Sequence, residues 1–337
     1  MKQHVYHFIS LPKYLLMRRF LFLFLLVIYC FLPTNAFTWG FFAHKKINQL
    51  AVFTLPPEMI TFYKLNIDYL AKHATDADRR RYAVKGEAEK HYIDMDHYGS
   101  NPLGSVPPKW KDAVDKFSED SLNAYGIVPW RIEKMLNSLT VAFKEMNVDR
   151  ILYVSANLGH YIADANVPLH TTENYNGQFT NQVGIHAFWE SRLPELFSDN
   201  WNFFTGRAKY IEDPNQEIWR IIKQSFAAKD SVLNFEAELG AKWSVDKKYS
   251  YEGNKKVYTY EYSAAYNKKL NSMVERRMRN AISTIGNFWY TAWVNGGQPD
   301  LNRLLTKEVS DSLKTEKIDP GNDSIPVGVQ KGHDHEE

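Results

Sequence analysis

The sequence is short of cysteine. Its only one, Cys30, lies in an apolar segment near the N-terminus. The rest of the chain therefore offers neither a disulfide nor a thiolate ligand, so any metal site must use His, Asp, Glu or backbone groups. A serine or cysteine nucleophile motif is also missing, so the sequence offers no candidate for covalent catalysis by such a side chain.

A strong excess of one charge is absent too. The chain has 41 basic and 39 acidic residues, and four of the basic ones, Lys2, Lys13, Arg18 and Arg19, lie within residues 1–38, which hold no acid. Residues 39–337 thus carry 37 basic and 39 acidic side chains, a net charge of −2. No global basic field favours nucleic-acid binding, so any such binding would have to be local.

The N-terminus is typical of a signal peptide. Arg18 and Arg19 precede the apolar run 20–31, and small residues follow up to Thr38. The run has about twelve residues, too few for a comfortable membrane span, although a short membrane anchor is the alternative. We therefore expect residues 1–38 to be removed and the protein to be exported, to the periplasm or outside the cell.

Apolar periodicity predicts an all-α fold with one multi-helix domain over residues 39–305. Helices are expected at 44–52, 57–72, 110–125, 128–146, 149–165, 186–193, 213–229 and 263–294, with loops at 101–108 and 171–184. Alternating tyrosines in 247–262 indicate a β-hairpin, with a loop as the alternative. Residues 306–337 are polar and predict a disordered tail.

Two histidines are followed by a carboxylate four residues later: His160 by Asp164 and His186 by Glu190. On a helix this spacing places both side chains on one face, where they can converge on a metal. With His170 between them, five ligand-type residues fall within 160–190. Capping or core packing explains any one of these histidines, but a shared metal site explains the set better.

Further candidates lie upstream. Asp76 precedes His91 by fifteen residues, and His44 closes the segment that starts at Trp39. An ion-paired surface acid is the alternative for Asp76, because arginines follow it. His73 and His97 are left over, and we expect both to be structural.

In their order, these motifs resemble the superfamily of zinc-dependent phospholipases C and single-strand-specific zinc nucleases, which is all-α. The motifs are Trp39-Gly-Phe-Phe-Ala-His44, Asp76 with His91-Tyr-Ile-Asp94, His160-x3-Asp164-x5-His170, and His186-x3-Glu190. The resemblance implies three zinc ions. The first would be held by Asp76, His91, His160 and Asp164, the second by Asp164, His44 and Trp39, and the third by His170, His186 and Glu190.

The resemblance also implies a reaction, in which metal-activated water attacks phosphorus and Asp76 and Asp164 are the catalytic carboxylates. Trp39 would bind zinc through its amino and carbonyl groups, which requires that the mature chain start there. Cleavage after Thr38 would free this amino group, whereas cleavage after Ala36 would not, and the sequence permits both.

The substrate is a phosphodiester whose class the motifs leave open. The spacings around Trp39 and Asp76 and the Glu173-Asn174-Tyr175 segment are similar to the nuclease branch, which we favour slightly; Glu190 and the short 170–186 interval are similar to the phospholipase branch. Asp94 and Asn174 are candidate substrate contacts, although Asp94 could orient a ligand or lie at the surface. A non-catalytic secreted zinc-binding protein is the alternative from another class. No protein partner is inferred, and a monomer is expected.

Overall fold

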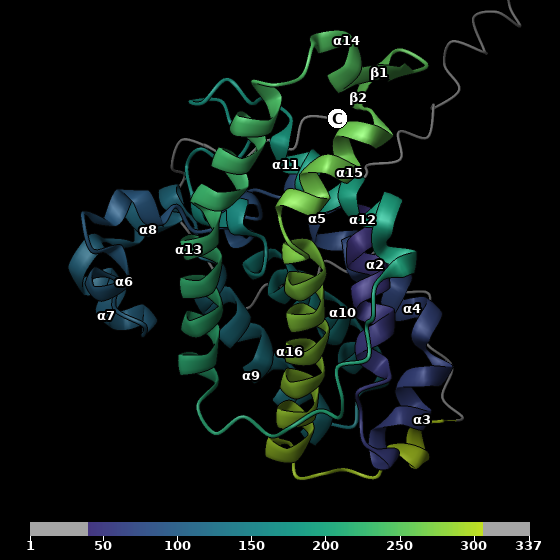
Figure 1. Ribbon diagram of the computed structural model, residues 1–337. Coiled ribbons are helices and arrows are strands. Elements are labelled where there is room, and N and C mark those ends of the chain that lie inside the picture. Colours follow the sequence, from purple (N-terminus) through teal and green to yellow (C-terminus); the bar gives the residue numbers. More distant parts are fainter. Residues whose placement is uncertain (1–39, 306–337) are drawn as a thin grey trace, which may run out of the picture. The chain divides into compact units, whose positions relative to one another are not determined.

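The computed structural model describes residues 40–305, so the predicted leader, Trp39 and the predicted tail lie outside the described residues. Within that range the chain is helical apart from one two-stranded hairpin, which confirms the all-α class (Figure 1). In the described part, no helix combines the length and apolarity needed to cross a membrane.

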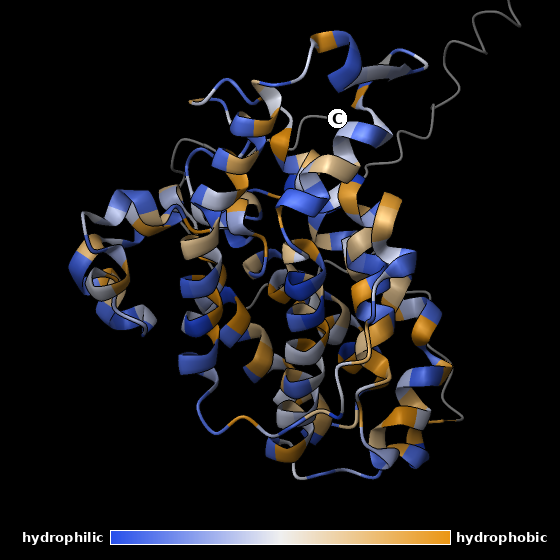
Figure 2. Cartoon of the chain, in the orientation of Figure 1, coloured by the Kyte–Doolittle hydropathy of each residue, from blue (hydrophilic) through white to orange (hydrophobic). Residues whose placement is uncertain are grey.

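Helix α10 (Val148–Ala165) lies at the centre of the fold. Fifteen of its eighteen residues are buried, because it is covered by α9 (Val128–Lys144), α2 (Phe41–Val52) and α16 (Met273–Asn295). α13 (Pro214–Gly240) also packs against it. The outer helices show hydrophilic residues on their exposed turns and hydrophobic ones toward their neighbours, as expected for amphipathic helices (Figure 2).

Helices α2 and α10 approach each other closely at Gly159. A Cβ atom at this position would lie 2.1 Å from Oδ1 of Asn48, so no larger residue fits without a shift. The Asn48 side chain also donates a hydrogen bond to the carbonyl of Ala156 at 3.1 Å. This crossing brings His44, one turn before Asn48, next to His160.

The remaining elements are short. They are α3 (Pro57–Leu65), α4 (Ile67–Lys72), η1 (His73–Thr75), α5 (Asp76–Arg81), η2 (Ala88–Lys90), η3 (Met95–Tyr98), α6 (Pro102–Ser105), α7 (Trp110–Phe117), α8 (Glu119–Tyr125), η4 (Pro168–Thr171), α11 (Ile185–Ala187), η5 (Phe188–Arg192), α12 (Leu193–Phe197), η6 (Ser198–Asn200), α14 (Val245–Lys248), α15 (Tyr260–Lys269) and η7 (Leu301–Leu304).

Several predicted helices are broken where the backbone leaves the helical region. The helix expected over 110–125 ends at Ser118, and the one over 263–294 is interrupted at Asn271 and Ser272, all three with positive φ. The helix over 57–72 is divided at Asn66. α13 runs eleven residues beyond the predicted end at Lys229, and the loop over 101–108 contains α6.

The predicted hairpin is confirmed. Strands β1 (Tyr249–Glu252) and β2 (Lys255–Tyr258) pair antiparallel, with Tyr249 opposite Tyr258. Gly253 turns the chain with a φ of +64°, which favours glycine. Tyr258 stacks on Phe188 of η5 with ring centroids 3.7 Å apart, so the base of the hairpin is fixed against that turn.

Candidate metal centre

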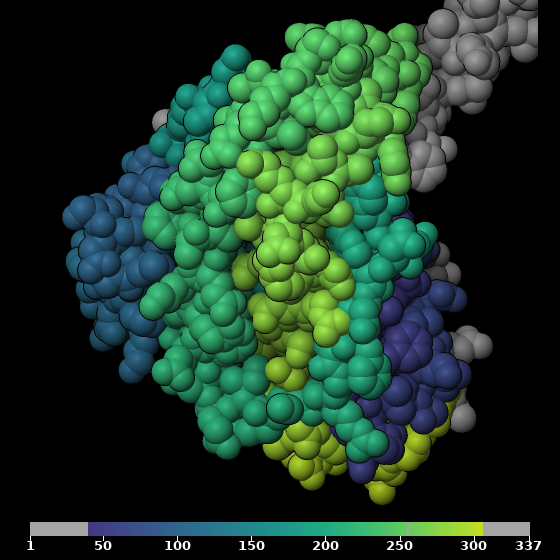
Figure 3. Space-filling model, in the orientation of Figure 1, coloured from purple at the N-terminus to yellow at the C-terminus, as the bar shows by residue number. Residues whose placement is uncertain are grey.

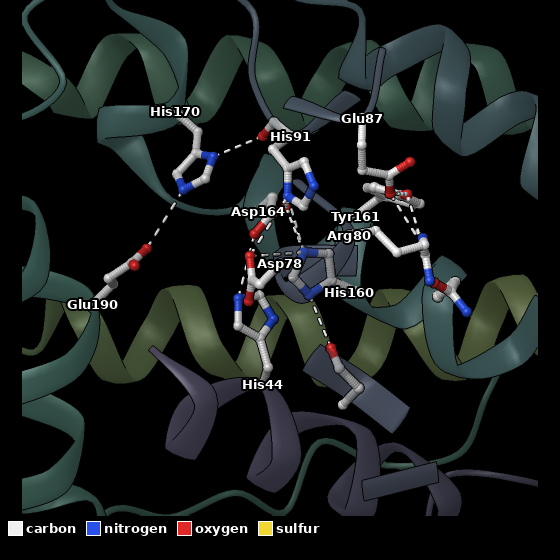
Figure 4. A network of polar contacts seen from close by, with 12 residues as sticks. His44, Asp78, Arg80, Glu87, His91, His160, Tyr161, Asp164, His170 and Glu190 are labelled. Carbon is white, nitrogen blue, oxygen red and sulfur yellow. Dashed lines mark hydrogen bonds and ion pairs between the residues drawn. The ribbon is translucent and has the colours of Figure 1, made fainter. Parts of the chain in front are cut away.

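The candidate ligands are brought together by helices α2, α5, α10 and α11, by the turns η4 and η5, and by the residue that ends η2. His160 and Asp164 lie one turn apart on α10, and His44 comes from α2 (Figure 4). The rings of His44 and His160 stack with centroids 4.2 Å apart, and Nε2 of His44 lies 3.3 Å from Oδ1 of Asp164. These three buried residues form the first group of converging donor atoms.

A second group shares residues with the first. Oδ2 of Asp164 lies 3.0 Å from Nδ1 of His91 and 3.1 Å from Nε2 of His160. Oδ1 of Asp78 lies 3.7 Å and 3.5 Å from the same two histidine nitrogens. Asp164 therefore directs one oxygen to each group, which is the arrangement a bridging carboxylate requires.

The third group consists of His170, His186 and Glu190. Oε2 of Glu190 lies 3.0 Å from His186 Nε2 and 3.5 Å from His170 Nε2. Glu190 lies in η5, a π-helical turn, and such turns are frequent at functional sites. His170 Nδ1 is 2.6 Å from the carbonyl oxygen of His91, which links this group to the second.

Among the described residues, Asp78 is the α5 carboxylate that lies beside His91 and His160. The two oxygens of Asp76 lie 2.6 Å from His73 Nδ1 and 3.2 Å from Arg79 Nη1. The role of Asp76 as a zinc ligand and catalytic carboxylate stays a prediction. Sequence spacing alone could not separate two carboxylates two residues apart.

The donor set fits zinc. Five imidazoles and three carboxylates converge without any thiolate, within the N/O chemistry that zinc accepts. Imidazole nitrogens face each other at 3.0 Å between His160 and His91 and at 3.1 Å between His186 and His170.

The pKa values of the donor residues also fit a site for cations. Burial by itself would lower the pKa of His160, but the charges of Asp164 and Asp78 outweigh it and raise the pKa to about 9. Burial would raise the pKa of Asp164, yet the charges of His160 and His170 hold it well below its ordinary value. In the protein alone, protons on the histidines therefore offset the negative charge of the carboxylates. A metal ion that binds here must displace these protons.

Buried contacts behind the ligands fix their orientation. Nδ1 of His160 lies 2.9 Å from the carbonyl oxygen of Ala74 in η1. The ring edge of Tyr161 meets His91 at 5.4 Å, and the Tyr161 hydroxyl donates to Glu87 at 2.5 Å. Glu87 is also paired with Arg80 at 3.1 Å. Such outer contacts hold ligand rings in one rotamer.

Sequence reasoning missed Arg81. It lies three residues after Asp78 on α5, so the two side chains share a helix face. Arg81 is only 5% exposed, and its two Nη atoms have no hydrogen-bond partner among the described residues. Its charge adds to the effect of burial in lowering the pKa of His186. A buried, unpaired cation next to the centre is suited to an anionic ligand.

The two predicted substrate residues each follow a donor histidine in the sequence, but their environments differ. Asp94 is buried three residues after His91, near Asp96 and Glu173. Asn174 accepts a hydrogen bond from the backbone N–H of Phe179 and donates to Thr180. The side chain of Asn174 therefore organises the loop after His170, and its role as a substrate contact stays a prediction.

His97, like His73, makes local contacts. Its ring stacks on Tyr125 with centroids 3.8 Å apart, and Nε2 lies 3.0 Å from a carboxylate oxygen of Glu173. Neither histidine belongs to one of the three donor groups among the described residues.

Asp94 gives a prediction about pH. Burial, with the charges of Asp96 and Glu173, raises the pKa of Asp94 to about 8, whereas in the unfolded chain it is about 4. The folded protein therefore keeps a proton that the unfolded chain loses, and stability falls as the pH rises between these values. We expect Asp94→Asn to raise Tm by roughly 2–4 °C at pH 8, and not near pH 4. Paired thermal unfolding curves across this range test it, and an equal gain at both ends would contradict it.

Comparison with known proteins agrees with this geometry. A search of curated proteins returned no match. A family model described as zinc dependent phospholipase C matches residues 43–253, more than half of the chain and all three donor groups. The superfamily expected from the motifs is thereby confirmed, and so is the expected enzyme class. The chain belongs to the zinc-dependent phospholipase C family and is a zinc-dependent phosphodiester hydrolase.

Proposed function

We propose that this chain cleaves the phosphodiester bond of a phospholipid at a centre of three zinc ions. Asp78, His91, His160 and Asp164 would hold the first ion, Asp164 and His44 the second together with Trp39, and His170, His186 and Glu190 the third. The observation that carries the proposal is that the two oxygens of Asp164 lie against donors of two groups, while the third group shares no residue with them. With three protein donors, the third site would keep a coordination position for substrate.

Zinc, when bound, supplies Lewis acidity that activates water and offsets charge on the phosphate oxygens. The protein does the rest. Asp164 fixes the spacing between its two groups, and Arg81 would contact the phosphate from the α5 side. The most accessible donors are the carboxylates of Asp78 and Glu190, whose side chains are 16% and 12% exposed, so substrate would enter beside them.

A matched pair of variants tests the assignment on α5. We expect Asp78→Asn to lose the zinc ion that Asp78 would share with His91 and His160, and to lower kcat/KM by roughly 10²–10³-fold. Asp76→Asn should retain both zinc and most of the activity, because the hydrogen-bond partners of Asp76 in the described part of the chain are His73 and Arg79. Zinc content by native mass spectrometry and hydrolysis rates measure both. The reverse order of effects would restore Asp76 as the ligand.

Charge near the centre supports a phospholipid over a nucleic acid. The segments leaving His91 and His170 bring Asp96 and Glu173 close together, since the backbone N–H of Glu173 donates to Oδ2 of Asp96 at 3.1 Å. Such a group would repel a polyanion but would attract the cationic part of a zwitterionic headgroup. The description of the matched family points the same way.

Single-stranded nucleic acid, which the motif spacings favour slightly, is the second candidate. The observation in its favour is Tyr82, a 65% exposed ring that directly follows Arg81. Bases stack well on such rings.

Direct assays separate the two. The zinc-loaded protein is incubated with phosphatidylcholine and with single-stranded DNA, and a chelator-treated sample is the control. We expect release of the phosphorylated headgroup, lost on chelation and restored by zinc. Cleavage of DNA alone would establish the nuclease instead, and inactivity on both substrates with zinc bound would overturn the proposed phosphodiester substrates.

We also propose export with cleavage before Trp39. Gly40, the first described residue, lies beside the centre, since a Cβ atom there would be 3.2 Å from a carboxylate oxygen of Glu190. A free amino group on the preceding residue would thus start next to the donor groups. The mass of the protein purified from the secreted or periplasmic fraction reports the N-terminus. A mature chain that begins at Phe37 would remove the Trp39 amino group from the ligand set.

A further inference from the structure

Exposed apolar side chains gather at one end of the described part, on two segments that flank the third donor group. Tyr251 of the hairpin is 73% exposed, Val245 of α14 is 71% exposed, and Phe179 of the loop at 172–184 is 66% exposed. Val183 of the same loop is also exposed. In Figure 2, α14 shows hydrophobic and hydrophilic turns side by side at this end.

The two segments are held together by one buried carboxylate. Glu236, near the end of α13, accepts a hydrogen bond from the Gln182 side chain at 2.6 Å. Its other oxygen pairs with Lys248 Nζ at 2.7 Å and accepts from the Tyr262 hydroxyl at 2.7 Å. The loop and the hairpin are therefore neighbours on a shared support. Figure 3 shows the green and teal segments at the upper end of the face it presents.

The same segments border the centre. His186 directly follows the loop, and its ring meets Tyr175 with centroids 6.0 Å apart. On the other side, Arg192 of η5 pairs with Glu252 of the hairpin at 3.1 Å. Glu190, one of the two most accessible donors, thus lies between the loop and the hairpin.

The charge of the hairpin end differs from that of the chain as a whole. Residues 241–256 contain five lysines and two acids, whereas residues 39–337 carry a net charge of −2. One of the two acids, Glu252, is paired with Arg192. Nζ of Lys256 lies 3.7 Å from the centroid of the Tyr249 ring, so this ammonium group lies over an aromatic face. Aromatic and aliphatic tips beside lysines are the composition of interfacial membrane anchors.

We propose that this end is a docking surface for anionic lipid bilayers, formed by Phe179, Val183, Val245, Tyr251, Lys247 and Lys256. The apolar tips enter the headgroup region, and the lysines bind the negative surface. Docking there presents the side of the third donor group to the bilayer, where phosphodiester headgroups are concentrated. This inference rests on the proposed phospholipid substrate.

Vesicle co-sedimentation tests the surface directly, with vesicles of phosphatidylcholine alone and of phosphatidylcholine mixed with phosphatidylglycerol. We expect Val245→Ser/Tyr251→Ser to bind both at least about tenfold more weakly than the native chain. Lys247→Gln/Lys256→Gln should lose only the preference for phosphatidylglycerol, which added salt also weakens. The matched control is Leu65→Ser on α3, because Leu65 is 67% exposed outside this surface.

Activity distinguishes docking from catalysis. On a short-chain phosphatidylcholine dissolved as monomers, both double variants should match the native chain, whereas on vesicles Val245→Ser/Tyr251→Ser should be at least about tenfold slower. Equal vesicle binding by this variant and Leu65→Ser would overturn the docking surface. Failure of the native chain to cleave the monomeric lipid would overturn the proposed substrate instead, whatever the binding result.

Discussion

Replacement of Asp164 by asparagine should leave zinc only at the third donor group and lower kcat/KM on the order of 10³-fold or more. Asp164 directs Oδ1 to His44 and Oδ2 to His91 and His160. An amide offers one neutral oxygen, and its NH2 group cannot bind a metal. Both sites that share Asp164 therefore lose a charged ligand in one substitution.

Native mass spectrometry and hydrolysis rates measure this result together. Retention of zinc by His170, His186 and Glu190 would show that the variant is folded. Asp199→Asn is the matched control, because Asp199 is an exposed carboxylate that forms an ion pair with Lys46, and it should have native activity. A folded Asp164→Asn protein with full zinc content and native activity would exclude a bridging role.

Replacement of Arg81 by methionine should lower kcat/KM by roughly 10²–10³-fold while zinc content stays unchanged. In the protein without substrate, the guanidinium is buried and its Nη atoms are unpaired, so methionine removes an uncompensated charge. Thermal stability should therefore hold or rise. A structural role for Arg81 would instead lower Tm along with activity.

Two comparisons sharpen this test. Arg81→Lys should be intermediate, because an ammonium keeps the charge but lacks the planar pair of donors that fits a phosphate. Arg79→Met should be close to native, since Arg79 is largely exposed and contacts Asp76 and Phe41. Inorganic phosphate should raise the Tm of the native chain and not that of Arg81→Met. Equal stabilisation of both proteins would place the anion elsewhere.

Much of the fold follows from the sequence because its longest helices have clear apolar periodicity. The predicted ends of α9 and α10 lie within two residues of the observed ones. The breaks could not be predicted, because the residues with positive φ at 118, 271 and 272 are serine and asparagine. No glycine or proline marks these positions in the sequence. Each of these breaks is a tertiary requirement that local propensity does not encode.

The donor groups were predictable to the extent that their spacing is helical. His160 with Asp164 and His186 with Glu190 needed only one turn of helix. Asp78 was not distinguishable from Asp76, because the choice depends on how the short helix α5 is rotated against α10. The position of Arg81 could not be predicted for the same reason. Of three successive arginines, Arg79 pairs with Asp76 and Arg80 with Glu87. Arg81 lies at the centre, where its charge acts on His186.

The close packing of Asn48 against Gly159 sets a tolerance for the metal centre. A Cβ atom at position 159 would lie 2.1 Å from Oδ1 of Asn48, whose side chain joins α2 to α10 by its hydrogen bond to Ala156. A methyl group there would leave every donor atom in the chain and yet displace this side chain, one turn of helix away from the stacked rings of His44 and His160. A residue without any chemistry of its own thus helps to hold two metal ligands in place.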